Sequence, residues 1–320
     1  MTSLKRAFTS SLALTALVMS GAHYASAQNP PPVRTPRQSQ KASVMQTIGV
    51  TDVEITYSRP GVKGRAIWGD APAGTAPGTA TLDDSRLRPK DMVIVPYGHV
   101  WRTGANEATL FEVSDNVMVN GQPLAAGRYS LHTIPAKDEW TIIFNKDDGQ
   151  WGSFTYDEKK DALRVKAKPE WETHSKEWLE FWIDPVNDNS AQVNIRWEKV
   201  RVPFTVEVKD VKALTLQKAR ASVAAAKADD FQTRAQAASF ALQNKLSVEE
   251  AMGWLDESIK IKATIGNVGL KARVLAEQGK TAEAIAAGER AIQVGKDAKA
   301  NPQAITNMEK LVAEWKAKKM

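Results

Sequence analysis

The hydrophobic pattern of this chain changes its period near residue 213, and this change constrains the fold more than any other feature. Before it, apolar and polar residues alternate over short segments, which is the pattern of strands with one solvated face. These segments are 52–58, 128–133, 139–145, 192–197 and 200–208. After it, Ala becomes abundant and the apolar spacing is helical. The sequence predicts an α+β multidomain chain: an antiparallel β-sandwich or jelly-roll-like domain over 43–212, followed by an α-helical domain over 213–320.

Two details refine the expected β-domain. Pro203 lies in the last alternating segment, and because proline donates no backbone hydrogen bond, it predicts an edge strand. Residues 69–92 hold Gly, Ala, Pro and Thr and then a charged stretch, with almost no apolar periodicity. A loop of this length is usually a mobile insertion or a lid, and we expect a mobile insertion here.

The helical region carries a weak repeat at an offset of 33 residues. Leu242 matches Leu275, and Ala251 matches Ala284. The spacing of small and apolar residues over 231–297 resembles two tetratricopeptide-like helical hairpins. Hairpin repeats bind peptides or proteins through their stacked helix faces, so a protein or peptide partner is expected at this domain.

Three local signals mark helix ends in this region. Ser247 and Glu250 have the spacing of a capping box, which predicts a helix start at Ser247. Gly279 fits the position just after a helix. Asn301 followed by Pro302 fits an N-cap and the first helical residue.

The N-terminus reads as a secretory signal over residues 1–27. Lys5 and Arg6 precede a short apolar run, and Ala25-Ser26-Ala27 is an A-x-A-type cleavage site. Cleavage between Ala27 and Gln28 would leave a Pro-rich, disordered leader over 28–42. We therefore expect a periplasmic or secreted protein, and no later segment is apolar enough to form a transmembrane span.

Several classes of chemistry are not expected. The chain has no cysteine, which excludes disulfides, thiolate nucleophiles and Cys-based zinc sites. No HExxH, P-loop or dinucleotide fingerprint occurs, so no metal and no cofactor are expected. The formal net charge of +6 lies mostly on the helical region, where a solvated helix surface is the simplest interpretation and nucleic acid is not expected as a partner.

Three stretches carry a family resemblance. They are "ITYSRPGVKGRAIWG" (55–69), "VPYGHVWRTGANEATLF" (95–111) and "GRYSLHTIP" (127–135), followed by "WTIIFNK" (140–146) and "WGSFTY" (151–156). Together they resemble the bacterial exported family catalogued as domain of unknown function 2911 (DUF2911), over roughly residues 43–200. The resemblance implies a secreted β-rich domain and carries no activity with it.

The first stretch contains three cations close to two glycines: Arg59, Lys63 and Arg65 lie near Gly61 and Gly64. Glycines let backbone N–H groups turn toward an anion, and Arg offers a fork for a carboxylate or phosphate. These residues are candidates for binding an anionic small ligand or a sugar acid. The alternative is a turn whose Arg side chains bind backbone carbonyls or pair with Glu107.

The second stretch adds Trp101, Arg102, Asn106 and Glu107 as ligand-binding candidates. Glu107, Arg102 and His99 are also weak catalytic candidates, because a carboxylate with a second polar group can perform general acid–base chemistry. The structural alternative is a rigid turn in which Arg102 and Glu107 hold each other. Asn106 would then tolerate a left-handed backbone.

Trp178 and Trp182 share one face of a predicted strand. We interpret this face as core or a domain interface; exposed, it would be a platform for sugar rings. The function that best fits the whole sequence is a non-enzymatic, exported binding or interaction protein with a glycan or anionic ligand at the β-domain. The alternative is a glycan-active hydrolase or lyase centred on Glu107, Arg102 and His99.

Overall fold

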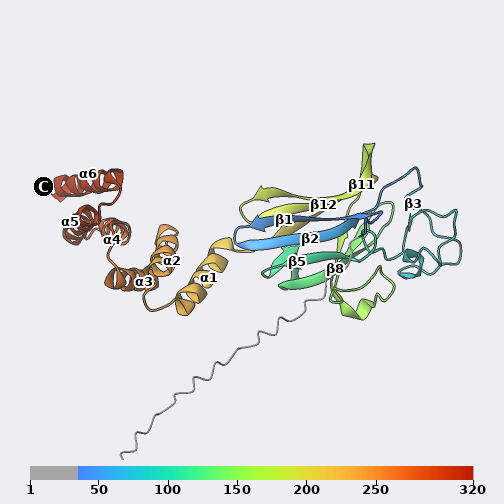
Figure 1. Ribbon diagram of the computed structural model, residues 1–320, viewed down its shortest axis with the longest axis horizontal. Helices are drawn as coiled ribbons and strands as arrows, with labels where there is room; N and C mark the ends of the chain where they lie inside the picture. Colours follow the sequence, from blue (N-terminus) through green and yellow to red (C-terminus); the bar gives the residue numbers. More distant parts are fainter. Residues whose placement is uncertain (1–34, 320) are drawn as a thin grey trace, which may run out of the picture. The chain divides into compact units, whose positions relative to one another are not determined.

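The computed structural model describes residues 35–319, so the expected signal segment and cleavage site lie outside the described residues. The first sheet has six strands, and every neighbouring pair in it is antiparallel (Figure 1). In spatial order they are β1 (Gln40–Ile48), β2 (Thr51–Arg59), β5 (Thr109–Val113), β8 (Gly127–Ile134), β9 (Trp140–Asn145) and β10 (Asp161–Ala167). Because β1 begins at Gln40, the last residues of the expected leader belong to the sheet.

The second sheet has four antiparallel strands. In spatial order they are β11 (Glu170–Asn187), β12 (Ser190–Glu207), β6 (Val117–Val119) and β7 (Gln122–Leu124). A short parallel pair, β3 (Trp68–Gly69) and β4 (Val95–Pro96), brackets the insertion expected over 69–92.

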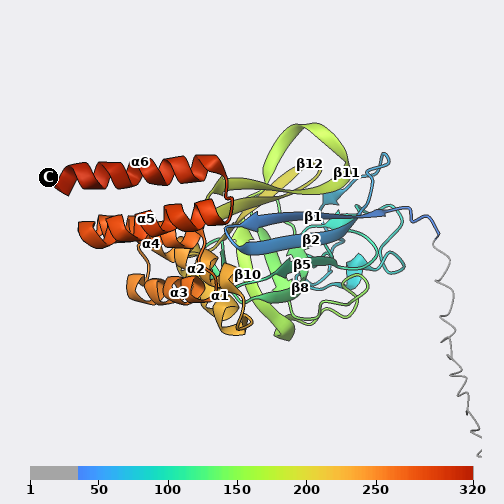
Figure 2. The same cartoon turned by 60° about the vertical axis from the view of Figure 1, so that its left-hand side comes forward.

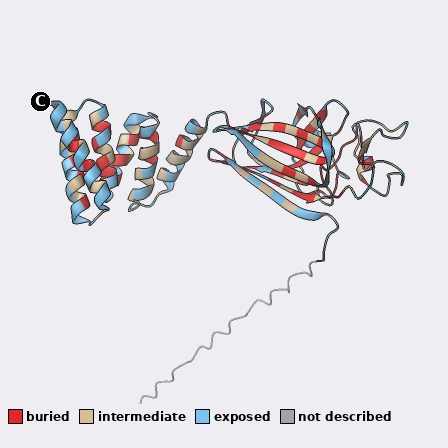
Figure 3. Cartoon of the chain, turned by 90° about the horizontal axis from the view of Figure 1, so that it is seen from above, coloured by how far each residue is buried: buried red, intermediate tan, exposed pale blue. Residues whose placement is uncertain are grey.

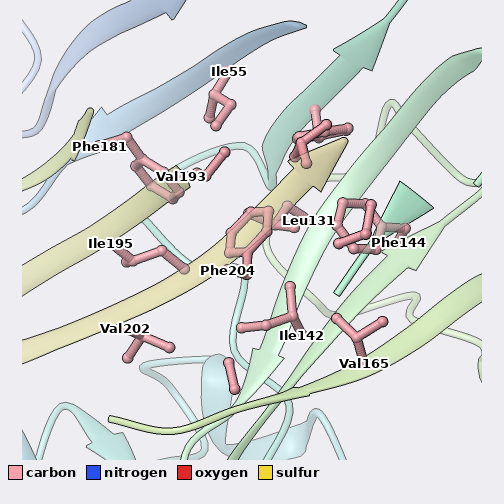
Figure 4. Close-up of a cluster of buried hydrophobic side chains, with 14 of the residues drawn as sticks. Ile55, Leu131, Ile142, Phe144, Val165, Phe181, Val193, Ile195, Val202 and Phe204 are labelled. Atoms are coloured by element: carbon pink, nitrogen blue, oxygen red, sulfur yellow. The ribbon is translucent and has the colours of Figure 1, made fainter. Parts of the chain in front are cut away.

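The core lies between the two large sheets (Figure 4). The ring of Tyr57 on β2 lies 4.7 Å from that of Phe181 on β11, centroid to centroid. Phe204 on β12 contacts Phe111 and Phe144 of the first sheet at 6.5 and 6.1 Å. These contacts across the layers confirm a sandwich of antiparallel sheets, held by the inward-facing residues of alternating strands.

The alternation in β2 behaves as predicted: Val53, Ile55 and Tyr57 are all buried. Figure 3 shows the same alternation of buried and exposed residues along the sheets. It arises because successive side chains of a strand point to opposite faces.

The two segments expected at 192–197 and 200–208 form one strand, β12. Glu198 has a positive φ of 53°, and the register with β11 shifts on both sides of Lys176, its partner. This irregularity lets both Trp197 and Val200 face the core, although they are three residues apart.

The expectation that Pro203 marks an edge strand is wrong, because β12 lies between β11 and β6. Pairing with β11 ends at Arg201, and pairing with β6 begins at Val206. Pro203 occupies the interval between the two ladders, where its missing N–H is tolerated.

The middle of the insertion packs against the β-domain. A short 3-10 helix, η1 (Thr81–Asp83), buries Leu82, and Asp84 is also buried. A second 3-10 turn, η2 (Glu158–Lys160), precedes β10. The contacts at Asp83 bear directly on the candidate site described below.

The region after the sandwich is helical, as expected (Figure 2). Its helices are α1 (Val211–Ala225), α2 (Phe231–Gln243), α3 (Val248–Ile261), α4 (Ile265–Glu277), α5 (Thr281–Asp297) and α6 (Pro302–Lys319). Across residues 35–319, no helix is both long and apolar enough to cross a membrane. The repeat positions Leu242, Leu275, Ala251 and Ala284 are all buried.

All three predicted helix ends are confirmed, since α3 begins directly after Ser247. Gly279 follows α4 with a φ of +76°, and the Asn301 side chain accepts a bond from the Gln303 N–H at the start of α6. The capping box at Ser247 is wrong: Ser247 is left-handed (φ 41°, ψ 52°) and its side chain makes no capping bond. Its Oγ instead accepts a bond from Arg220. A left-handed backbone is incompatible with the extended geometry that N-capping requires.

Candidate functional site

Five of the seven ligand-binding candidates line one cavity of about 440 Å³. They are Lys63, Arg65, Trp101, Arg102 and Asn106. Arg65 and Arg102 are 37 positions apart in the sequence, yet both line this cavity. The sandwich brings them together, since β2, which ends just before residues 60–65, pairs with β5, which follows residues 101–107.

The other candidates lie elsewhere. Arg59 donates from Nε to the Leu179 carbonyl oxygen at 2.8 Å. Glu107 forms a β-bridge with Trp151 and lines a different cavity. His99 is 3% exposed, with Nδ1 3.0 Å from the Tyr97 carbonyl oxygen. The lining of the Arg102 cavity therefore contains neither His99 nor Glu107.

The expected Arg102–Glu107 pair is wrong, because Arg102 pairs with Asp83 of the insertion. Arg102 Nε lies 2.8 Å from Asp83 Oδ2, and its Nη2 donates to the Asp83 carbonyl oxygen at 2.7 Å. Its Nη1 donates to the Asn106 carbonyl oxygen at 2.8 Å. The side chains of Arg102 and Asp83 are 10% and 6% exposed. Arg102 thus connects the insertion to the loop formed by residues 101–107, called the WRTGANE loop below.

Gly152 makes room for this arginine. A Cβ at Gly152 would lie 2.8 Å from Arg102 Cζ, and the backbone φ is +65°. The Gly152 N–H donates to the Asn106 carbonyl oxygen at 2.9 Å, which holds the loop over the guanidinium. The ring of Phe154 lies 5.0 Å from Arg102 Cζ, a cation–π distance. Only glycine satisfies both the left-handed backbone and the close approach at this position.

Three non-glycine residues around the cavity have left-handed backbones: Lys63 (φ 48°), Thr103 (φ 52°) and Asn106 (φ 62°). For the β-branched Thr103 this conformation is unusual. Its buried Oγ1 donates to Thr133 Oγ1 at 3.1 Å, and its carbonyl oxygen accepts from Thr109 Oγ1 at 2.8 Å. Such strain clusters at ligand-binding sites, where surrounding contacts over-determine the backbone.

The charge of the cavity lining is unbalanced. Lys63, Arg65, Arg88 and Arg102 line it, with Asp83 as the carboxylate among the same lining residues. Burial lowers the pKa of Arg88, and the positive charges of Arg102 and Arg65 lower it further, while Asp83 acts in the opposite direction. A cavity of this charge can hold an anion.

Arg65 and Arg88 are oriented by backbone carbonyls. Arg65 donates to the Gly61 and Val62 carbonyl oxygens at 2.6 and 3.1 Å. Arg88 Nη1 donates to the Ile94 carbonyl oxygen at 2.6 Å. These bonds fix the guanidinium groups without neutralising their charge, because the acceptors are uncharged.

Aromatic side chains form the rest of the wall. Trp101 and Trp197 are buried and stacked at 5.8 Å with an interplanar angle of 17°. Trp151 and Phe154 line the same cavity and are 54% and 42% exposed. The cavity therefore combines fixed cations with exposed aromatic faces, a lining suited to a ligand that has both charged and apolar surfaces.

A buried hydrogen-bonded chain extends from Asp83 into the sandwich. The Ser153 N–H donates to Asp83 Oδ2 at 2.9 Å, and Ser153 Oγ lies 2.9 Å from His132 Nδ1. His132 Nε2 lies 2.9 Å from Ser130 Oγ. Burial lowers the pKa of His132 to about 3, with a further contribution from the charge of Arg102. His132 is therefore neutral at pH 7 and serves as a structural connector.

The Trp178 and Trp182 face is not core. Trp178 is 40% exposed and Trp182 is half-buried, whereas Leu179 and Phe181 on the other face are buried. The expectation of a core position is therefore wrong for Trp178. Both faces of this strand are largely apolar in the sequence, but only the face with Leu179 and Phe181 packs against the first sheet.

Several cavity residues were not among the predicted ones: Asp83, Ser85, Arg88, Trp151, Phe154 and Trp197. The first three lie in the insertion, where the absence of periodicity gave no indication of a fixed position. Trp151 and Phe154 belong to the "WGSFTY" stretch, whose glycine between two aromatic residues was the available signal. Within residues 35–319, no group of three acidic or histidine side chains is placed to hold a metal ion.

Comparison with known proteins places the β-domain in a family. No curated protein and no solved structure matches the chain. The family model described as "Protein of unknown function (DUF2911)" matches residues 39–206. This range runs from β1 to the penultimate residue of β12 and includes every residue that lines the cavity except Gln38. The chain therefore belongs to the DUF2911 family.

Proposed function

We propose that this chain is an exported binding protein whose β-domain takes a small acidic ligand, of the sugar-acid class, in the cavity lined by Lys63, Arg65 and Arg88. The observation that carries the proposal is the unbalanced charge of that cavity. Asp83 is already committed to Arg102 through a 2.8 Å ion pair. The other three cations are therefore not balanced by a carboxylate of the lining.

The orientation of these cations supports a carboxylate as the bound group. The carbonyl bonds of Arg65 and Arg88 fix their guanidinium planes before a ligand arrives, which reduces the entropy lost on binding. A ligand carboxylate would also offset the burial and, after it, the neighbouring positive charges that lower the pKa of Arg88. Charge-assisted bonds of this kind are stronger than neutral ones.

The size and aromatic content of the cavity support a sugar ring. A volume of about 440 Å³ lies within the range typical of small-molecule sites. The exposed faces of Trp151 and Phe154 offer flat apolar surface next to the cations. A sugar acid matches this lining, because its ring has apolar C–H faces and its carboxylate carries the charge.

The enzymatic alternative needs Glu107, Arg102 and His99 to converge in an open cleft. Arg102 and Glu107 line different cavities, and His99 is buried against Tyr97. Arg102 is also held by Asp83 and Asn106. This separation favours binding over catalysis at these residues.

Export and the use of the helical region remain predictions from sequence. The export proposal rests on residues 1–27, and N-terminal sequencing of the native protein checks it: Gln28 is the expected first residue. An intact Met1 in the mature protein would contradict it. A protein or peptide partner at the helical hairpins rests on their repeat spacing.

Calorimetric titration with glucuronate and glucose tests the binding proposal. Glucuronate should bind at least tenfold more tightly, and added salt should weaken it, because the attraction is electrostatic. Lys63→Met should reduce glucuronate affinity by about tenfold, the effect of losing one charged hydrogen bond. Equal binding of the two sugars, or no binding of glucuronate, would overturn the proposal.

Lys137→Met is a matched control for Lys63→Met. Each lysine has its Nζ 5.9 Å from an aromatic ring, Tyr97 for Lys137 and Trp178 for Lys63, and Lys137 is not among the cavity residues. Lys137→Met should leave glucuronate affinity within about twofold of wild type. Equal losses from both variants would show a general effect of net charge and would refute binding in this cavity.

A further inference from the structure

We infer that a second cavity, which shares a side chain with the Arg102 cavity, binds an uncharged sugar ring, so that the ligand is an acidic sugar joined to a neutral one. This inference rests on the proposed function and names its ligand more closely. The second cavity has a volume of about 550 Å³ and is lined by Thr81, Leu87, Phe154 and Tyr156 among others. We call it the Thr81 cavity.

The two cavities lie on either side of one segment of the insertion. Residues 81–88 supply lining residues to both, namely Thr81, Asp84 and Leu87 to the Thr81 cavity and Asp83, Ser85 and Arg88 to the Arg102 cavity. Phe154 lines both cavities and is 42% exposed. A ligand of two rings can therefore lie over Phe154 with one ring in each cavity.

Two guanidinium groups contact the ring of Phe154. Its centroid lies 5.0 Å from Arg102 Cζ and 6.0 Å from Arg86 Cζ, both cation–π distances. Arg102 is paired with Asp83, which lines the Arg102 cavity, and Arg86 is paired at 2.6 Å with Asp84, which lines the Thr81 cavity. Phe154 is thus held in place at the boundary that the two cavities share.

The Thr81 cavity offers apolar surface to a ring. The hydroxyl of Tyr156 donates to Asp161 Oδ2 at 2.8 Å and accepts from Arg164 Nη2 at 2.7 Å, which fixes the orientation of its aromatic ring. Leu87, in the same lining, is 60% exposed. Together with Phe154, these side chains can pack against the C–H face of a sugar.

Two threonine hydroxyls of the insertion supply polar contacts in this cavity. Within residues 35–319, Thr81 Oγ1 makes no hydrogen bond, so it can both donate to a ligand and accept from it. Thr79 Oγ1 donates to the Ala76 carbonyl oxygen at 3.2 Å and keeps its capacity to accept. Hydroxyl groups of a sugar match these two side chains.

The charges of the lining favour an uncharged ring. None of the described residues that line the Thr81 cavity is Lys, Arg or His, so a carboxylate bound there would find no cation in the lining. Asp84 and Glu158 already have Arg86 and Arg164 as partners, at 2.6 and 3.5 Å, and Asp157 Oδ1 accepts from the Lys159 N–H. The lining therefore does not require a cationic ligand either.

The test compares four probes by calorimetric titration. They are glucuronate and three disaccharides of one linkage, in which glucuronate is joined to glucose, to a second glucuronate or to glucosamine. The glucuronate–glucose disaccharide should bind at least tenfold more tightly than glucuronate, because its second ring gains contacts in the Thr81 cavity. It should bind more tightly than the diglucuronate, and the glucosamine disaccharide should gain no further affinity.

Thr79→Val and Thr81→Val each replace a hydroxyl by a methyl group of similar size. Each should lower the affinity for the glucuronate–glucose disaccharide about fivefold, the effect of one lost hydrogen bond, and leave glucuronate affinity unchanged. Unchanged thermal unfolding of each variant shows that the fold is intact.

Thr75→Val is the matched control for Thr79→Val. Both hydroxyls belong to the insertion and donate to the carbonyl oxygen of the residue three positions earlier, at 2.8 Å for Thr75 and 3.2 Å for Thr79. Thr75 lines neither cavity, so its replacement should change neither affinity.

The outcomes separate the two proposals. Equal affinity for glucuronate and the glucuronate–glucose disaccharide overturns the second-cavity inference and leaves the acidic-ligand site intact. Tighter binding of the diglucuronate or of the glucosamine disaccharide also overturns it, as do equal effects of Thr79→Val and Thr75→Val on disaccharide affinity. Failure of every acidic sugar to bind overturns both proposals.

Discussion

Arg102 Nε lies 2.8 Å from Asp83 Oδ2, and through this pair three separate loops are tied together. Asp83 belongs to the insertion, Arg102 to the WRTGANE loop, and the Ser153 N–H donates to the same Asp83 oxygen at 2.9 Å. Both charged side chains are nearly buried. Arg102 therefore has a structural role in shaping the cavity.

Asp83→Asn should destabilise the protein by about 3–5 kcal/mol, because it leaves the buried Arg102 cation without its counter-charge. Asp70→Asn is the control in the same insertion: Asp70 and Lys137 form an exposed pair at 3.4 Å, whose loss should change stability by less than about 1 kcal/mol. Urea unfolding followed by tryptophan fluorescence measures both. Equal stabilities of the two variants would show that the Arg102 pair contributes no more than a surface contact.

His132 should make the protein less stable in acid. Its pKa is about 3 in the folded chain against an ordinary value of 6.5, so below pH 6.5 the unfolded chain binds the proton more readily. The contribution of neutral His132 to the free energy of unfolding is complete above pH 6.5. It declines by about 1.4 kcal/mol per pH unit as the pH falls toward 3.

The difference in unfolding free energy between wild type and His132→Gln isolates this effect from other titrating groups. His132→Gln should be less stable than wild type at pH 7, because its contacts with Ser130 and Ser153 are altered. The gap should narrow by about 3 kcal/mol between pH 6.5 and pH 4, since only the wild type loses the His132 contribution. A gap that stays constant over this range would rule out a depressed pKa at His132.

The features that sequence predicted well are local. Val53, Ile55 and Tyr57 alternate because a half-buried strand requires it, and all three lie in the core. Gly279 and Asn301 mark helix ends through backbone preferences that need no tertiary partner. Such signals lie within a few residues of the structure they determine.

The features that sequence missed depend on contacts between distant segments. Arg102 has Glu107 five residues away, yet it pairs with Asp83, which lies in a segment without any periodic pattern. Pro203 suggested an edge, but which strands flank β12 depends on the whole sandwich. The residues that line the cavity were predicted only in part for the same reason. Lys63 and Arg102 belong to recognisable stretches, whereas Arg88 lines the cavity because of how the insertion folds.

Thr264 and Ser247 show how a correct motif can stand at the wrong place. The reciprocal capping box belongs to Thr264: its Oγ1 accepts from the Asn267 N–H at 3.2 Å, and Asn267 Oδ1 accepts from the Thr264 N–H at 2.8 Å. Thr264→Ala should cost about 1 kcal/mol of helical stability. Ser247→Ala should cost only a few tenths, because Ser247 makes no capping bond. Urea unfolding followed by circular dichroism at 222 nm checks this order. A larger loss of stability from Ser247→Ala than from Thr264→Ala would contradict it.

Gly288 lets α6 approach α5 closely, and its replacement tests that packing. A Cβ at Gly288 would lie 2.4 Å from Val312 Cγ2 and 3.2 Å from the Trp315 ring, so one helix must shift to admit even a methyl group. Intrinsic propensity favours alanine over glycine in a helix by about 1 kcal/mol, but the overpacking costs about 1–3 kcal/mol. Gly288→Ala should therefore destabilise the helical region on balance.

Gly253 in α3 is the matched control, because a Cβ there would meet no atom within 4 Å. Gly253→Ala should raise stability by up to about 1 kcal/mol, which reverses the sign of the effect at Gly288. Denaturant unfolding followed at 222 nm measures both variants, and stabilisation by Gly288→Ala would mean that α5 and α6 do not pack this closely in solution.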